Sequence, residues 1–295
     1  MPDAPQEQKP TGAAKTTSAK PCVCCLHTEA APALAGLLRC AQCGHVYADM
    51  TESPELFKEL YTRNYFKGGE YADYEQEEQA LRLNFRRRVR ELAARHPSGA
   101  TLWEIGCAYG FFLKEAASYF DAAGCDVAED AIHAATTKHG VRAHCLDYLR
   151  HTLAPPRDVI CLWDVIEHLP EPDLFLEKAL HDLRPGGTLA LSTGDIGSLC
   201  ARLRGRHWRQ IHPPTHIQYF TRHSMTTLLT RLGYANIEII YPAFWRNMDT
   251  VAGKILTRHR AGTTLYRALH RVGLLHFNFP LNLYDLMTVY ARKPE

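Results

Sequence analysis

From about residue 100 to the end of the chain, short apolar runs alternate with longer amphipathic stretches. Short apolar runs between turn residues predict buried strands, and apolar residues repeated every three or four positions predict helices. Strands are predicted from Thr101 to the acid at 104, and at 122–127, 141–145, 158–163, 188–192, 236–241 and 286–292. Helices are predicted at 110–119, 174–183 and 224–233. Strands that alternate with helices indicate an α/β fold with a mainly parallel sheet.

The first predicted strand ends in a turn that contains two glycines. Glu104 lies at the end of the strand, Gly106 follows it, and Gly110 opens the next helix. Such a turn is typical of nucleotide sites in α/β proteins, because glycine lets a ligand approach the main chain and the helix N-terminus offers amides. The spacing is not G-x-G-x-x-G, so the dinucleotide fingerprint is absent. An ordinary strand-to-helix turn would have a similar sequence, so the rest of the chain is needed to distinguish a nucleotide site from such a turn.

The stretch reads E-x-G-C-x-x-G and resembles motif I of the class I S-adenosylmethionine-dependent methyltransferases. A second acid, Asp126, lies 20 residues beyond Gly106 at the end of the next strand, where an acid can accept both hydroxyls of a ribose. The segment 126–132 also resembles the family pattern, as does the Pro-Gly-Gly turn at 185–187. The resemblance covers about residues 100–241 and the last strand.

This resemblance implies a Rossmann-like methyltransferase sheet of seven strands, with the last strand inserted antiparallel between the fifth and sixth. It implies S-adenosyl-L-methionine as the cofactor, bound across the carboxyl edge of the sheet. Asp126 would bind the ribose and Asp147 the adenine, although Asp147 could instead be a cap acid. The cofactor-binding residues that we expect are Glu104, Gly106, Cys107, Gly110, Asp126, Val127, Asp147 and Trp163.

Residues 21–50 carry two C-x-x-C pairs. Cys22 and Cys25 form the first pair, and Cys40 and Cys43 form the second. Two such pairs separated by a short loop have the ligand spacing of a zinc ribbon. A closed four-thiolate site is structural, and a segment this small needs the metal in order to fold.

Three alternatives to this zinc assignment stay open. Cys24 could replace Cys25 as a ligand, and His45 is a weaker substitute. The four cysteines could also form a cluster of buried thiols without a metal.

Two further segments precede the methyltransferase-like domain at 97–295. Residues 1–20 have no apolar repeat and are predicted to be a disordered tail. Residues 51–96 are predicted to be mainly helical, with aromatic residues around Gly68-Gly69 that would pack between helices or act as a lid. The helix at 81–94 carries Arg82, Arg86, Arg87, Arg88 and Arg90. We interpret these arginines as a solvated basic face, with phosphate binding as the alternative.

Residues 194–220 form a long connection after the fifth strand, and long connections inside a compact domain are usually functional. From Trp208 to Thr221 the chain resembles a subgroup of bacterial methyltransferases. Several of these carry an N-terminal zinc-binding segment, and they act on sugars, including nucleotide-linked sugars. The resemblance implies a sugar-like small-molecule acceptor. The arginines at 202, 204, 206 and 209 would suit a phosphorylated one, although a basic surface helix would look the same.

Residues 242–283 are predicted to be a helical insertion. Within it, an apolar stripe at 265–279 lies beside basic residues. Such a stripe can lie on a membrane surface, but a cover over the substrate site or a homodimer contact is commoner. We therefore expect no membrane partner and keep the homodimer as an alternative.

Composition sets the remaining bounds. The chain has 295 residues, of which 46% are hydrophobic, enough for one large core with appendages. A net charge of +2 gives no reason to expect a nucleic-acid partner. No apolar run is long enough to span a bilayer, and no signal sequence opens the chain. We expect a cytoplasmic protein whose ten cysteines are thiols or metal ligands.

Methyl transfer requires alignment of the acceptor and a base that removes its proton. His168, which follows the fourth strand, and His216, in the 194–220 segment, are the candidate catalytic residues. We favour His216 because it lies on the part that varies with substrate in this family. A structural hydrogen bond is the alternative role for each histidine, and Glu167 would orient its neighbour.

Three other hypotheses stay open at this point. An RNA methyltransferase would need a basic ribbon, but residues 22–50 hold one Arg and no Lys. An inactive binding protein would not need to keep the motif spacing. Asp164, Glu167 and His168 resemble, apart from the first residue, the E-x-x-E-H metal site of some quinone O-methyltransferases, which would suit Mg²⁺.

Overall fold

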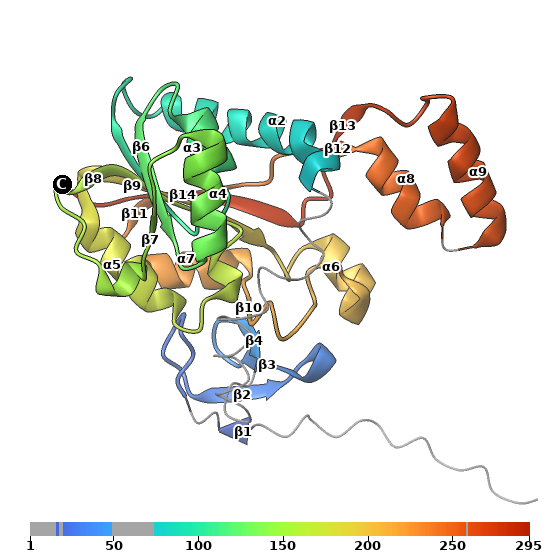
Figure 1. Ribbon diagram of the computed structural model, residues 1–295. Coiled ribbons are helices and arrows are strands. Elements are labelled where there is room, and N and C mark those ends of the chain that lie inside the picture. The colour runs from blue at the N-terminus through green and yellow to red at the C-terminus, as the bar shows by residue number, and fades with distance from the viewer. Residues whose placement is uncertain (1–15, 18–19, 49–73, 258) are drawn as a thin grey trace, which may run out of the picture.

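The computed structural model describes residues 16–17, 20–48, 74–257 and 259–295. A seven-stranded sheet lies at the centre, with the strand order β11-β14-β9-β8-β5-β6-β7 (Figure 1). Its strands are β5 (Thr101–Ile105), β6 (Asp121–Asp126), β7 (Ala143–Cys145), β8 (Arg157–Trp163), β9 (Leu183–Gly194), β11 (Ala235–Ile240) and β14 (Leu286–Arg292). β14 runs antiparallel between β9 and β11, and the pairs among β5 to β9 are parallel. The predicted sheet, including its antiparallel strand, is confirmed.

Alternate side chains of the strands form two cores, one on each face of the sheet. On one face, Leu102 and Val159 pack against apolar residues of three helices. On the other face, Trp103 and Ile160 pack against apolar residues of two helices. The helices of the first face are α2 (Tyr74–Ala93), α3 (Phe111–Ala116) and α4 (Glu129–His139), and those of the second are α5 (Pro172–Asp182) and α7 (Arg222–Arg231). The molecule is therefore a three-layer α/β structure.

The cysteine-containing segment forms a second, smaller sheet at one end of the molecule (Figure 1). Its strands are β1 (Thr16–Thr17), β2 (Glu29–Pro32), β3 (Leu37–Cys40), β4 (Val46–Ala48) and β10 (Gln218–Tyr219), with the short helix η1 (Leu34–Gly36) between β2 and β3. β10 belongs to the predicted substrate segment, so this sheet joins two distant parts of the sequence. β1 lies within residues 1–20, where we had predicted no structure.

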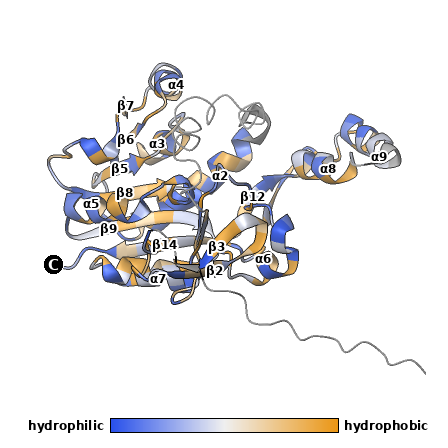
Figure 2. Ribbon diagram, turned by 90° about the horizontal axis from the view of Figure 1, so that it is seen from below, coloured by the Kyte–Doolittle hydropathy of each residue, from blue (hydrophilic) through white to orange (hydrophobic). Residues whose placement is uncertain are grey.

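The insertion at 242–283 is only partly helical. It begins and ends with two strands that pair antiparallel, β12 (Phe244–Asn247) and β13 (Asn278–Leu281). Between them α8 (Met248–Leu256) and α9 (Arg260–Arg271) form a hairpin that projects from the body (Figures 1 and 2). The prediction of an all-helical insertion is wrong at both ends, because β12 and β13 are 30 residues apart and only their pairing makes them strands.

Short elements complete the described chain. They are α6 (Leu199–Arg204) and the 3-10 helices η3 (Tyr148–Arg150), η4 (Ile166–His168) and η5 (Gly205–His207). The aromatic residues around Gly68-Gly69, predicted to pack between helices or act as a lid, lie outside the described residues, except for Tyr74 at the start of α2. Among the helices described, none is long and apolar enough to cross a membrane.

Candidate functional site

The turn after β5 requires glycine at two positions. Gly106 and Gly110 have φ angles of 75° and 73°, in the left-handed region that favours glycine. A Cβ atom on Gly106 would lie 2.6 Å from Val165 Cγ2, and one on Gly110 would lie 2.6 Å from Val141 Cγ2. Both positions therefore exclude a side chain.

The backbone amides of this turn are used inside the protein. Gly106 and Cys107 both donate to the carbonyl of Cys125, at 2.8 and 3.0 Å, and the amide of Ala108 donates to Asp126 at 2.9 Å. The neighbouring parallel strand β6 thus supplies an acceptor for the amides of Gly106 and Cys107. Their contact with the cofactor stays a prediction.

Two buried carboxyl groups lie at the carboxyl ends of β5 and β6. Glu104 is 3% exposed and Asp126 is 8% exposed, and burial raises the pKa of both. Asp126 also accepts the amide of Ala128 at 3.0 Å. Glu104 Oε2 and the indole nitrogen of Trp163 are buried without a hydrogen-bond partner among the described residues. Unpaired buried polar atoms fit a polar ligand at this edge, since such atoms are otherwise costly.

The two remaining cofactor candidates lie nearer the surface. Asp147 accepts the amide of Leu149 at 3.0 Å and pairs with Arg150 at 3.4 Å, so it serves as the cap of η3. Val127, directly after β6, is 59% exposed. The adenine contact of Asp147 stays a prediction.

The arginines of α2 are not all solvated. Arg88 is 2% exposed, and its guanidinium donates to Asp164 at 3.0 Å and to the Ser192 hydroxyl at 2.9 Å. It also lies 4.5 Å from the ring centre of Trp163. The interpretation as a solvated basic face is wrong for Arg88, which joins α2 to the carboxyl ends of β8 and β9.

A signal for this burial was present in the sequence. Ala80, Asn84, Arg88 and Leu92 recur every four residues and are all buried, so Arg88 lies on the inward face of α2. The exposed side of the helix carries Arg82 and Arg86, which both bind Glu115, at 2.8 and 2.7 Å.

The two predicted catalytic histidines lie side by side. The ring centres of His168 and His216 are 4.5 Å apart, and His212 lies 3.7 Å from His216. The Nδ1 atom of His168 donates to the carbonyl of Thr215 at 2.8 Å, and that of His216 donates to the carbonyl of Gln210 at 3.0 Å. A carbonyl can only accept, so each neutral ring carries its proton on Nδ1 and its lone pair on Nε2.

Burial governs the protonation of these groups. It lowers the pKa of His168 to about 4, and burial together with the neighbouring rings of His168 and His212 lowers the pKa of His216 to about 2. Both rings are therefore neutral at physiological pH and can accept a proton. Burial, followed by the charge of Asp164, raises the pKa of Glu167 to about 8.

The small sheet contacts both histidine segments. β10 follows His216 directly and pairs with β4. His45 donates from Nε2 to the side-chain oxygen of Gln218 at 2.8 Å. The amide nitrogen of Gln218 donates to the carbonyls of Leu169 and Pro170, at 3.3 and 3.4 Å, directly after His168. His45 was a weak ligand candidate, and the structure gives it this bridging position instead.

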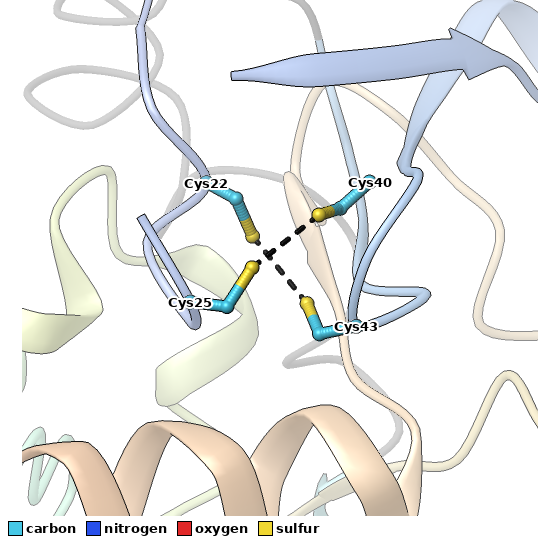
Figure 3. Close-up of side chains that lie close together, drawn as sticks. All are labelled: Cys22, Cys25, Cys40 and Cys43. Atoms are coloured by element: carbon cyan, nitrogen blue, oxygen red, sulfur yellow. Dashed lines mark hydrogen bonds between the residues drawn. The ribbon is translucent and has the colours of Figure 1, made fainter. Parts of the chain in front are cut away.

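The four predicted metal ligands converge (Figure 3). The sulfur of Cys22 lies 3.6 Å from that of Cys43, and the sulfur of Cys25 lies 3.5 Å from that of Cys40. Zinc–sulfur bonds of about 2.3 Å in a tetrahedron place sulfurs a little under 4 Å apart, so this cluster fits one zinc ion. Cys24 is buried in contact with Cys22 and Cys43, but it is not among the four cysteines whose sulfurs all lie within 4.8 Å of one another, which favours Cys25 as the ligand.

A second group of metal-ligating side chains includes the histidine pair. Ligand atoms of Glu167, His168 and His216 all lie within 4.8 Å of one another. The set differs from the one we considered from the sequence, because Asp164 binds Arg88 and is replaced by His216. Two imidazoles and one carboxylate suit a transition metal better than Mg²⁺.

The arginines of the substrate segment divide into two groups. Arg209 forms two hydrogen bonds with the buried carboxylate of Asp285, which also accepts the indole N–H of Trp208 at 2.8 Å. Arg209 therefore has a structural partner and is a weaker phosphate candidate than predicted. The three remaining arginines are exposed: Arg202, Arg204 and Arg206.

Comparison with known proteins identifies the fold and the chemistry. Residues 75–239 match the family model of a methyltransferase domain. The chain is 35% identical over 113 residues to a ubiquinone biosynthesis O-methyltransferase of Caulobacter vibrioides, which is 35% of this chain and 45% of that protein. The match thus spans less than half the length of this relative.

Solved structures resemble the chain at the level of the fold. A SAM-dependent methyltransferase from Thermotoga maritima has a TM-score of 0.54 at 16% identity, covering 80% of this chain and 99% of that one. Phosphoethanolamine N-methyltransferase 2 of Haemonchus contortus, in complex with S-adenosyl-L-methionine, has a TM-score of 0.50 at 15% identity, covering 81% of this chain and 60% of that one. The family match, the seven-stranded sheet and the glycine turn lead to one conclusion: the chain belongs to the class I S-adenosylmethionine-dependent methyltransferases.

Proposed function

We propose that the enzyme methylates a hydroxyl oxygen of a small-molecule acceptor bound beside His168 and His216. The observation that carries this proposal is the pair of neutral, buried imidazoles with both Nδ1 atoms held by backbone carbonyls. The name of the Caulobacter relative, an O-methyltransferase, supports an oxygen acceptor. A sugar or nucleotide-linked sugar is the acceptor class that the subgroup resemblance predicts, and the relative's name gives that finer choice no support.

The cofactor would lie at the carboxyl ends of β5, β6 and β8. Asp126 would accept the ribose hydroxyls, Glu104 and Trp163 would bring their unpaired polar atoms to the ligand, and Asp147 would reach the adenine. When bound, the cofactor supplies a sulfonium-activated methyl group. The chain's own contribution is then to align the acceptor oxygen and to exclude water.

His216 would take the proton of the acceptor. The hydrogen bond from Nδ1 to Gln210 fixes the ring orientation and leaves Nε2 as the proton-accepting atom. A hydroxyl oxygen becomes strongly acidic as it gains a methyl group, so a base of low pKa is sufficient for this step. His168, held through Thr215, would orient the acceptor or share the proton.

We further propose one structural zinc ion on Cys22, Cys25, Cys40 and Cys43. Its role would be to hold β4, which pairs with β10 and carries the connection from His45 to Gln218. The zinc ribbon would thereby fix the position of the histidine segment that faces the acceptor, although it contributes no reacting group.

A second candidate mechanism follows from the grouping of Glu167, His168 and His216. A divalent transition-metal ion on these three side chains would lower the pKa of a bound acceptor hydroxyl, which replaces the need for a base. This hypothesis predicts that activity depends on an added divalent ion and is lost with a chelator too weak to remove the four-thiolate zinc.

The proposed function is tested by following S-adenosylhomocysteine release with a panel of acceptors. The panel holds nucleotide-linked sugars, free sugars, catechols and amines, each with wild-type enzyme and with His216→Ala. We expect turnover with one hydroxyl class, lost in His216→Ala. Turnover with amines alone would contradict the oxygen-acceptor proposal.

A further inference from the structure

The α8–α9 hairpin presents exposed apolar side chains away from the methyltransferase body. Leu265 is 50% exposed on α9, and Val272, directly after that helix, is 67% exposed. With the exposed Ala268 they follow a spacing of three and four residues, so they share one side of the helix. Leu274 and Phe277 continue the apolar surface, 62% and 48% exposed.

The helix that packs against α9 does not cover its apolar side. The main contact of α9 is α8, and the hairpin projects beyond the body on the two-stranded sheet β12–β13 (Figures 1 and 2). An apolar stripe that the fold does not cover marks a site of interaction with something else.

The charged residues of the same segment, apart from histidine, are all basic. Residues 250–284 contain five Lys and Arg and no Asp or Glu, whereas acids outnumber Lys and Arg in the rest of the chain. Arg267 and Arg271 are exposed one helical turn apart, next to the apolar stripe. Asp249, the acid that precedes the segment, is bound to His270 at 2.8 Å. The hairpin is thus a positively charged amphipathic surface.

The combination of exposed apolar side chains and basic residues distinguishes between the possible binding partners of this surface. A second hairpin of another copy would bring the exposed Arg267 and Arg271 of both copies together, and the acid of the hairpin, Asp249, is already bound to His270. A nucleic acid would satisfy the cations but would gain nothing from the exposed aliphatic side chains. An anionic lipid surface satisfies both, since apolar side chains enter the acyl boundary while arginines extend to the headgroups.

We propose that the α8–α9 hairpin docks the enzyme on an anionic membrane surface. Sequence alone favoured a cover over the site or a dimer contact. The projecting hairpin, whose acid Asp249 is already bound to His270, changes that expectation. The root of the hairpin borders a cavity of about 230 Å³ that also touches Asp285 and Leu286. Leu286 pairs with Gly194 at the end of β9, so docking holds the acceptor-facing edge of the sheet near the lipid.

The test is sedimentation of the 295-residue chain with lipid vesicles. Vesicles of pure phosphatidylcholine are compared with vesicles that contain one quarter phosphatidylglycerol, at low and high salt. We expect binding to the anionic vesicles, weakened at high salt and at least about tenfold weaker for the neutral ones, because lipid charge and basic residues attract each other. Absence of binding to anionic vesicles at low salt overturns the proposal.

Two double variants separate the apolar and charged contributions. Leu265→Asp with Val272→Asp removes the apolar stripe, and Arg267→Glu with Arg271→Glu reverses the charge. Each should weaken vesicle binding at least about tenfold. The matched controls are Leu174→Asp on α5 and Arg90→Glu on α2, also exposed, which should bind like wild type.

Circular dichroism confirms that each variant is folded before it is compared. Unchanged vesicle binding in both hairpin variants overturns the proposal. So does a wild-type dimer, measured by light scattering, that only the hairpin variants abolish, because the surface would then join two copies. Vesicle binding is measured without acceptor or cofactor, so its failure leaves the proposed methyl transfer untouched.

Discussion

The two halves of the candidate site are held together in different ways. The cofactor half is a local structure, in which the turn after β5 bonds to the next strand β6, about 20 residues away. The acceptor half is assembled over long distances, since Gln218 bonds to His45 across 173 residues and to Leu169 across 49. Damage to the small sheet should therefore disturb the acceptor half and leave the cofactor half intact.

The histidine segments show this dependence most clearly. The carbonyls of Gln210 and Thr215 fix the two rings, and the amide of Ile217 donates to the carbonyl of Glu167 at 2.9 Å. A turn at 212–215, in which the amide of Thr215 donates to the carbonyl of His212 at 3.2 Å, orders one part of this arrangement. The segment also depends on β10, which pairs with β4 of the cysteine-containing sheet.

The largest expected effect is loss of the metal. Cys40→Ser should reduce zinc from about one equivalent per chain to none, because three thiolates no longer close the tetrahedral site. Elemental analysis of purified protein measures this. Cys145→Ser, an exposed cysteine outside the cluster, is the control and should keep its zinc. Metal loss in Cys24→Ser but not in Cys25→Ser would contradict the ligand assignment.

Next in size is the loss of the cofactor contact. Asp126→Ala should weaken S-adenosylhomocysteine binding on the order of 10²-fold, because two hydrogen bonds to a charged group disappear. Calorimetry gives the dissociation constant. Asp121→Ala, at the other end of β6, is the matched control with an exposed carboxylate. Equal affinity in Asp126→Ala and Asp121→Ala would remove the ribose assignment.

Loss of the base should be of similar size but act on turnover. His216→Ala should lower kcat about 10²-fold with cofactor affinity nearly unchanged, since a positioned acid–base group contributes that much. Steady-state kinetics with the identified acceptor measures it. The exposed His223→Ala on α7 is the control. Near-normal turnover in His216→Ala would transfer the role to His168 or away from histidine.

A smaller effect is expected at Gln218, which connects the small sheet to the segment directly after η4. Gln218→Met keeps the volume but removes the bonds to His45, Leu169 and Pro170, so kcat should fall roughly tenfold, as for a group slightly displaced from its working geometry. Gln42→Met, exposed in the cysteine-containing segment, is the control. A parallel loss of cofactor affinity would mean that the substitution only destabilises the fold.

The smallest effect concerns pH. Because burial lowers the pKa of His168 to about 4 and that of His216 to about 2, both stay neutral as the pH falls from 7 to 5.5. We expect kcat at saturating substrates to change less than about twofold over this range, whereas a base with the ordinary histidine pKa of about 6.5 would lose most of its activity. An acid limb near pH 6.5 would contradict this expectation.

The same shifts carry a stability consequence with a defined sign. An unfolded chain binds protons to these histidines below about pH 6.5, while the folded chain does not, so stability falls as the pH drops below that value. For His168 the lowered pKa corresponds to roughly 3 kcal/mol, lost between about pH 6.5 and 4.

Sequence reasoning predicted the local half of the site better than the long-range half. The sequence predicts the glycine turn and its acids because the whole motif lies in one segment. This motif comprises Glu104, Gly106, Gly110 and Asp126. The C-x-x-C pairs are readable for the same reason. Gln218 and His45 carry no such pattern, and their contact exists only after β4 and β10 pair.

Arg88 and the strands β12 and β13 show two other causes of failure. Charge suggested that Arg88 is solvated, although its position in the repeat of α2 places it inside. β12 and β13 are short and lie within a largely helical segment, so only their pairing across the hairpin makes them strands.

The most direct test of the central claim is calorimetry with S-adenosylhomocysteine on wild-type protein and on Cys40→Ser, with turnover measured on the same samples. The account predicts one binding site in both proteins, with dissociation constants within about twofold, and turnover that is lost only in the variant. No binding to folded wild-type protein would contradict the cofactor assignment. Equal loss of binding and turnover in Cys40→Ser would contradict the separation of the two halves.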